Sequence, residues 1–193
     1  MKILIYKNPE KFSTIVCKKL FLLFFTLTIF ISCDKDTFKG NDQLPPETQI
    51  GANTVGCLVN GKVYLPSQSG INPSVNCQYE FLDNEYYFII SFADDLNLGP
   101  NVSVQTLRIN LAQGNNYVLN KNIIDNGDFT GGSGAFRLST FNKYYTNTLK
   151  TGKLKITRLD LQNSIISGTF WFDAINAAGE NIEIREGRFD WNY

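Results

Sequence analysis

A chain of 193 residues has the length of one ordinary domain plus an extension, and its 43% apolar and 13% aromatic content is ample for a packed core. The composition therefore excludes a largely disordered chain. The precursor has 18 basic and 18 acidic residues and no histidine, which excludes Ser-His-Asp and Cys-His catalytic relays and zinc sites that need histidine.

The first 32 residues have the three parts of a secretory signal peptide. Five lysines and one glutamate lie within residues 1–19, and an uncharged apolar run from Leu20 to Ile31 follows them. This run is shorter than the about 20 apolar residues that a membrane-spanning helix needs. We expect residues 1–32 to be cleaved off as a signal peptide.

The residue after the expected cleavage site favours lipidation. The stretch IFISC, which ends at Cys33, resembles the lipobox of bacterial lipoproteins, although Phe30 stands where leucine is commonest. In such proteins the cysteine carries acyl chains such as palmitate. Two or three chains attach a protein stably to the membrane, because each buried methylene contributes about 0.8 kcal/mol. The alternative is an uncleaved anchor or an ordinary signal peptide in which Cys33 is incidental.

Cleavage would change the charge of the chain. Residues 1–32 carry five of the basic residues and one of the acidic residues, so 13 basic and 17 acidic residues remain and the net charge is near −4. A mildly acidic domain without a lysine or arginine cluster is a poor candidate for nucleic-acid binding, because such binding requires several phosphate contacts. We therefore expect the lipid anchor to bind the membrane, and we expect no nucleic-acid partner.

Two cysteines remain in the exported part, because Cys17 leaves with the signal peptide and Cys33 carries lipid. In an oxidising compartment, Cys57 and Cys77 are predicted to form a disulfide. It would close a loop of 21 residues and contribute about 3 kcal/mol to stability. Two buried free thiols are the alternative.

Residues 33–50 are predicted to be a flexible tether, and residues 51–193 an all-β domain. The tether is polar and contains the doublet Pro45-Pro46. The first expected hairpin turns at Asn60-Gly61, because both residue types accept the positive φ of a type I′ turn. A second hairpin joins CQYEFL and YYFIISFA across Asp83-Asn84.

The rest of the chain also favours strands. The stretch TLRINLAQ at 106–113 is predicted to be a strand, and GGSGA at 131–135 a mobile loop. A hairpin is expected across residues 162–164, with a β-bulge at Thr157-Arg158 where the apolar phase slips by one residue. NIEIRE and GRFDWNY are expected to be two strands joined across Gly187. Nine or ten strands predict a single antiparallel β-sandwich or flattened barrel.

Several stretches of the chain resemble a family of predicted lipoproteins from flavobacteria and related Bacteroidota. They are LPPETQIGANTVGCLVNGKVYLP, GKLKITRLD and IISGTFWFDAINAAGENIEIREGRFD, and the likeness covers most of the chain from Leu44 to Tyr193. The exported domain of that family has no assigned function, so the resemblance implies an envelope lipoprotein and no catalytic residues. The DKD that follows Cys33 is also similar to signals that send lipoproteins of these bacteria to the cell surface. We expect an outer-membrane protein that faces the periplasm or the cell exterior.

Acidic residues are the remaining route to catalysis, since two carboxylates can cleave a glycosidic bond without histidine. The acids at expected strand ends are Asp94, Asp95, Asp160 and Asp173. No pattern pairs them, and acids near turns are usually solvated caps of hairpins. DNGD at 125–128 is only a fragment of a calcium loop. We expect no cofactor and no metal.

Aromatic residues are the main positive signal for binding. The candidates are Trp171, Trp191, Tyr144 and Tyr145. Trp171 lies out of phase with Phe170 and Phe172, so it is either exposed, where it could stack on a sugar ring or a partner, or covered by a second sheet. We expect a non-catalytic binding or structural module with a glycan or an envelope protein as its partner. The alternative is a carboxylate-based hydrolase that acts on glycans.

Overall fold

Strands make up all the regular structure in the part of the chain that the structure describes, which is residues 43–66, 74–93, 99–123 and 129–193. The structure is a computed structural model, and its described residues belong to one compact unit that spans Lys39–Tyr193. The predicted signal peptide and Cys33 lie outside the described residues. The strands are β1 (Thr54–Val59), β2 (Lys62–Tyr64), β3 (Val75–Leu82), β4 (Glu85–Ala93), β5 (Asn101–Leu107), β6 (Asn116–Leu119), β7 (Gly131–Arg137), β8 (Lys143–Tyr145), β9 (Gly152–Asp160), β10 (Ile165–Ile175) and β11 (Asn181–Asn192).

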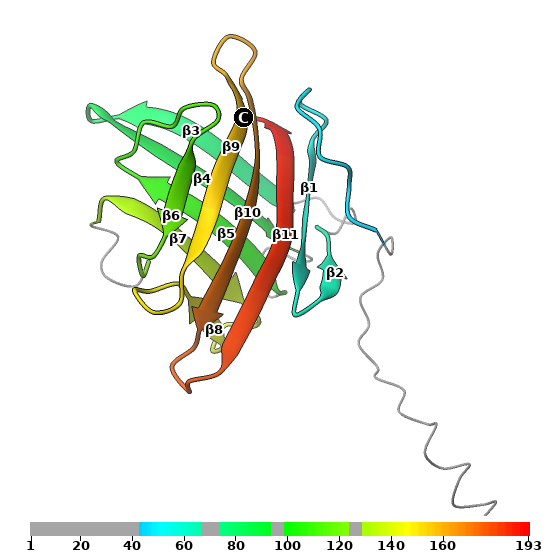
Figure 1. Cartoon of the computed structure of the whole chain (residues 1–193), viewed down its shortest axis with the longest axis vertical. Coiled ribbons are helices and arrows are strands. Elements are labelled where there is room, and N and C mark those ends of the chain that lie inside the picture. Colours follow the sequence, from blue (N-terminus) through cyan, green and yellow to red (C-terminus); the bar gives the residue numbers. More distant parts are fainter. Residues whose placement is uncertain (1–42, 67–73, 94–98, 124–128) are drawn as a thin grey trace, which may run out of the picture. The chain divides into compact units, whose positions relative to one another are not determined.

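The eleven strands form one sheet in the order β2-β1-β11-β10-β9-β6-β7-β5-β4-β3, and β8 pairs with both β10 and β7. The β6–β7 pair is parallel, and the other pairs among the described strands are antiparallel. Figure 1 shows that the sheet turns over on itself, so that β9, β10 and β11 lie in front of β4 and β5. The predicted all-β class is confirmed, and the sheet matches the predicted β-sandwich or flattened barrel. The described residues form eleven strands instead of nine or ten, and the parallel β6–β7 pair departs from the purely antiparallel pairing that was expected.

The core lies between these two layers and is largely aromatic. Phe88 of β4 stacks on Phe189 of β11 with ring centroids 5.8 Å apart, and Phe92 lies 6.4 Å from Phe170 of β10. All four rings are buried. Burial of one such side chain stabilises the fold by about 1.5–3 kcal/mol, so these contacts hold the two layers together.

The predicted hairpins form as expected. Asn60 and Gly61 have φ of 48° and 79°, and Asp83 and Asn84 have φ of 50° and 64°. The predicted bulge in β9 is also present. Arg158 pairs with Ser167 and Ile156 pairs with Gly168, which leaves Thr157 as the extra residue.

Two predicted strand boundaries are wrong. The strand expected at 106–113 runs instead over Asn101–Leu107, because Arg108 has a φ of 59° and turns the chain out of the sheet. Leu111 beyond it is still buried, and its backbone N–H donates to the Tyr79 hydroxyl. The two strands expected on either side of Gly187 are one strand, β11, whose pairing shifts at residues 185–187.

The glycine-rich stretch at 131–135 is not a loop but most of strand β7, between β6 and β5. Glycine is required there by close packing. A Cβ at Gly134 would lie 2.7 Å from the Phe172 ring, and a Cβ at Gly132 would lie 2.6 Å from the carbonyl oxygen of Val118. The glycines therefore let the core and a neighbouring strand approach the backbone of β7.

The predicted disulfide is also wrong, because Cys57 and Cys77 are free buried thiols. The prediction assumed that the strands on either side of their connection are neighbours. In the sheet, β1 lies between β2 and β11, whereas β3 pairs with β4, where Cys77 faces Ile90. Burial raises the pKa of Cys77 to about 12 and also raises the pKa of Cys57.

Candidate functional site

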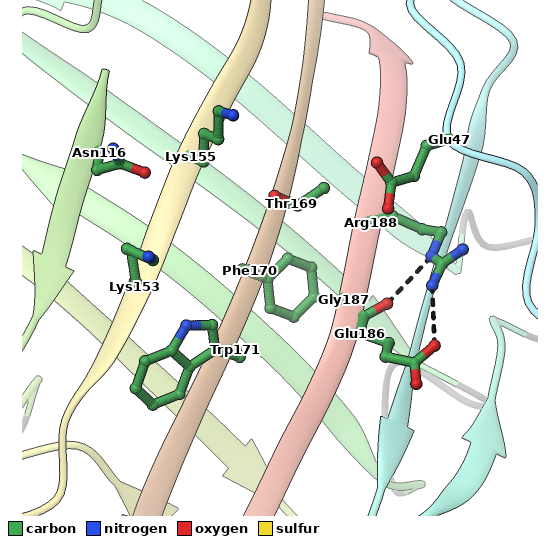
Figure 2. Close-up of a pocket in the computed structure, with 10 residues that line it drawn as sticks. All are labelled: Glu47, Asn116, Lys153, Lys155, Thr169, Phe170, Trp171, Glu186, Gly187 and Arg188. Atoms are coloured by element: carbon green, nitrogen blue, oxygen red, sulfur yellow. Dashed lines mark hydrogen bonds and ion pairs between the residues drawn. The ribbon is translucent and has the colours of Figure 1, made fainter. Parts of the chain in front are cut away.

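A shallow hollow lies on the sheet face that points away from the core, over β6, β9, β10 and β11. Its volume is about 620 Å³, and Figure 2 shows the ten residues that line it. We call it the Trp171 hollow. Nine of these residues come from the four strands, and Glu47 comes from the segment before β1.

Strand alternation sets which side chains enter the Trp171 hollow. Leu154 and Ile156 are buried in the core, so Lys153 and Lys155 of β9 point to the opposite face. On β10 the same alternation exposes Trp171. The register places Trp171 directly opposite Lys153, and Thr169 opposite Lys155. Side chains of directly opposite residues are close neighbours, so the two lysine side chains stand beside those of Trp171 and Thr169.

The floor of the hollow is formed where β11 bulges. Gly187 pairs with Phe170, and a Cβ at position 187 would lie 2.4 Å from the Phe170 ring. A side chain at position 187 would therefore collide with the Phe170 ring. The neighbouring residue Glu186 has a φ of 50°, which is the conformation that accommodates the bulge.

Charge is distributed unevenly over the hollow. On the β9 side, Lys153 and Lys155 are exposed and make no ion pair with the described residues. On the β11 side, Arg188 is paired with Glu186 at 3.2 Å, as the dashed lines in Figure 2 show. Glu47 adds an exposed carboxylate on that side. The β9 side is thus cationic and the β11 side is neutral to acidic.

Trp171 is the exposed aromatic residue of the hollow, with 39% of its surface accessible. The Arg185 guanidinium lies 5.6 Å from the ring centroid, which is within the range of a cation–π contact. Asp173 binds Arg185 at 2.5 Å and keeps it in place. The exposed alternative for Trp171 is therefore correct, and the core alternative is wrong.

The other three aromatic candidates do not join Trp171. Trp191 is half-buried against the core, and Tyr144 is buried with its hydroxyl donating to Glu180 at 3.2 Å. Tyr145 is half-buried in β8, and this burial raises its pKa. These three side chains contribute to packing. Of the four predicted aromatic candidates, Trp171 alone lines the hollow.

The predicted acidic candidates have structural partners or lie outside the described residues. Asp160 accepts hydrogen bonds from the backbone N–H groups of Gln162 and Asn163 and so caps the β9–β10 turn. The hydrogen bond from the Asn163 side chain, followed by that from Arg158, lowers the pKa of Asp160. Asp173 is paired with Arg185. Asp94, Asp95 and residues 125–128 are not described.

Asp190 is the most buried acid of the described residues, and no pattern in the sequence pointed to it. Only 1% of its surface is exposed. Its carboxylate accepts hydrogen bonds from Thr48 Oγ1 (2.6 Å), Ser167 Oγ (2.7 Å), Gly51 N (2.8 Å), Ile50 N (2.9 Å) and Ala52 N (3.1 Å). Burial alone would raise the pKa of Asp190, but the hydrogen bonds from Thr48, Ser167 and the backbone outweigh it and lower the pKa.

This arrangement fixes residues 48–52 against β11. The end of the predicted tether, at Thr48 and Ile50, is therefore bound to the sheet. Among the described residues, no helix is long and apolar enough to cross a membrane, and no group of three or more acidic or cysteine side chains is placed to hold a metal ion.

One family model matches the chain, over residues 94–190, and it is described as a domain of unknown function (DUF6252). The match includes every lining residue of the Trp171 hollow except Glu47. No curated protein and no solved structure matches the chain.

Proposed function

The chain belongs to the DUF6252 family, a domain of unknown function, and from its site we propose that it is a lipid-anchored envelope protein with a non-catalytic binding module. The Trp171 hollow is its binding surface, and the outer membrane is its location. One observation carries the proposal: in an open hollow, an exposed indole lies next to two lysines that make no ion pair with the part of the chain that the structure describes. Exposed aromatic side chains with a polar rim are typical of interaction sites.

The geometry of the hollow supports a binding role. Its side chains stand on paired strands, which hold them more accurately than loops do. Arg185 packs on the Trp171 ring and is itself held by Asp173. The indole is therefore positioned before a ligand arrives, which lowers the entropy that binding costs.

The placement of the acids supports a binding module over the alternative, a hydrolase that acts on glycans. Such a hydrolase needs two carboxyl groups about 5–10 Å apart across a cleft, one of them with a raised pKa. The pKa values of Asp160 and Asp190 are lowered instead. Asp173 is paired with Arg185, and Glu186 in the hollow is paired with Arg188.

The lipid anchor is supported by the sequence alone. An apolar run ends at Ile31, Ser32 and Cys33 follow it, and the chain resembles predicted lipoproteins of flavobacteria and related Bacteroidota. Mass spectrometry of the membrane fraction tests the anchor. We expect an N-terminal peptide that begins with acylated Cys33. We expect the Cys33→Ala protein to be lost from the membrane fraction. An unacylated Cys33, or a variant that stays in membranes at the wild-type level, would contradict the anchor.

The binding role is tested by screening the full chain, solubilised from membranes, against envelope and dietary glycans and against envelope proteins. Both binding and product release are measured. We expect binding without turnover, and we expect Trp171→Ala to abolish it. Phe141→Ala is the matched control, because Phe141 is an aromatic residue outside the hollow with 98% of its surface exposed. Turnover that depends on one of the acidic residues would favour the hydrolase instead.

A further inference from the structure

We propose that the ligand of the Trp171 hollow is an acidic saccharide, a sugar chain that carries carboxylate or sulfate groups. In this arrangement one sugar ring stacks on Trp171, and the acidic groups contact Lys153 and Lys155. The inference rests on the proposed function, because it names the ligand class of that binding surface.

The two lysines provide the charge complementarity. They lie two residues apart on one face of β9, which separates them by about 6.6 Å along the strand. Like charges on neighbouring side chains repel each other, and a bound anion would remove that repulsion. The exported part of the chain is acidic overall, with a charge near −4, so this pair is a local exception. A ligand with acidic groups on neighbouring units would meet both lysines.

The indole and the polar lining favour a sugar over other anions. A sugar ring has an apolar face of C–H groups that can pack on an aromatic ring, and hydroxyl groups at its edge. Asn116 and Thr169 supply an amide and a hydroxyl beside the lysines. The apolar lining residues are Trp171 and the buried Phe170. Such a lining does not suit a lipid tail or an apolar peptide anchor.

The acidic groups on the other side of the hollow set the direction of the ligand. On the β11 side the charge of Arg188 is already matched by Glu186, and the exposed carboxylate of Glu47 repels an acidic chain that extends over it. The ligand therefore runs from Trp171 over β9 towards Asn116 of β6, the side on which the lysines lie (Figure 2). A nucleic acid would contact both sides of the hollow and is disfavoured by the same carboxylates.

The test is a calorimetric titration of the full chain, solubilised from membranes in detergent, with four probes. These are tetragalacturonate, a chondroitin sulfate tetrasaccharide, maltotetraose and sodium sulfate. We expect at least one acidic saccharide to bind ten-fold or more tightly than maltotetraose and sodium sulfate. We expect its affinity to fall several-fold as salt is raised from about 0.05 M to 0.3 M, because exposed charges are screened.

Two variants and their controls locate the binding. Lys153→Gln combined with Lys155→Gln should lower the affinity for the acidic saccharide at least ten-fold, whereas Lys143→Gln, an exposed lysine of β8, should not. Trp171→Ala should have a similar effect, whereas Phe141→Ala should not. All five substituted positions are exposed, so circular dichroism should show the wild-type fold.

Each other outcome overturns a defined part of the account. If maltotetraose binds as tightly as the acidic saccharides and Trp171→Ala abolishes this binding, the ligand is not specifically acidic. The hollow then remains a binding surface. If sulfate binds as tightly as the acidic saccharides, the hollow recognises an anion and not a sugar chain, and the inference is wrong. Saccharide binding that none of the hollow variants weakens overturns both the inference and the proposed function. Absence of binding by all four probes overturns the inference, while the proposed function is decided by the wider screen with Trp171→Ala.

Discussion

At the scale of single residues, Asp190 shows how one buried carboxylate joins distant parts of the chain. It connects the segment before β1 to β10 and β11 through five hydrogen bonds. Hydrogen bonds to a charged group are stronger than those between neutral groups. The position of Asp190 in the sequence, between Phe189 and Trp191, indicates only an outward-facing polar residue, because the covering segment comes from the other end of the chain.

We predict that Asp190→Asn lowers the free energy of unfolding by about 2–4 kcal/mol, since a hydrogen bond to a charged group contributes about 1.5–3 kcal/mol and several weaken together. The amide also turns an N–H group towards N–H donors. Urea unfolding measures the change. Glu183→Gln is the control, because Glu183 is exposed and should cost less than about 0.5 kcal/mol. Equal stability of the two variants would show that the carboxylate is not needed.

The same residue predicts a dependence on pH. The pKa of Asp190 is lowered in the folded protein, and its unfolded value is about 3.9. Its contribution to stability is therefore complete above the unfolded pKa and is lost as the pH falls through the folded pKa. We expect the difference in free energy of unfolding between wild type and Asp190→Asn to decrease below about pH 4. Urea unfolding from pH 7 to pH 2 measures this difference. A gap that stays constant or widens towards acid would contradict the lowered pKa.

At the scale of strands, the sequence predicts the features that depend on neighbouring residues, such as turns and bulges. It does not predict features that depend on contacts with residues distant in the chain. The turns at Asn60 and Asp83 and the bulge at Thr157 were predicted correctly because local residue types determine them. Strand β7 was missed because its glycines are typical of loops. Gly134 is required by the ring of Phe172, a residue distant in sequence, and Gly132 by the carbonyl oxygen of Val118 in β6.

We predict that Gly134→Ala destabilises the protein by about 1–3 kcal/mol, the range for overpacking a filled core. The reason is that the added methyl group would lie 2.7 Å from the Phe172 ring. Thermal unfolding measures the change. Gly179→Asn is the control, because a Cβ there meets open space and asparagine tolerates positive φ. A fully stable Gly134→Ala protein would show that β7 is not packed as described.

Strand order also decides the chemistry of the cysteines. Cys57 and Cys77 lie in β1 and β3, which do not pair with each other, and both thiols are buried. Their raised pKa values keep them protonated at neutral pH, and the thiolate is the reactive form. We predict that iodoacetamide labels neither thiol in the native protein and labels both after denaturation. A linked peptide pair in a non-reducing digest would contradict the assignment of both cysteines as free thiols.

At the scale of the whole molecule, the candidate site could be predicted only in part. Trp171 was recognised because it lies out of phase with the buried Phe170 and Phe172. Its association with Lys153 and Lys155 depends on the pairing of β9 with β10, including the one-residue shift at Thr157. Without that pairing, the lysines are ordinary exposed residues of a strand. The site therefore emerges from register, which no short motif in the sequence encodes.

Ligand binding at the Trp171 hollow can be observed by NMR, because the chain has only two tryptophans. The measurement is the ¹⁵N–¹H spectrum of the indole groups during titration with a saccharide that calorimetry shows to bind. Trp171 lines the hollow, whereas Trp191 packs against the core. We predict that the Trp171 indole signal shifts in proportion to occupancy and that the Trp191 signal stays in place. A saturated complex in which the Trp171 signal does not move would contradict the account.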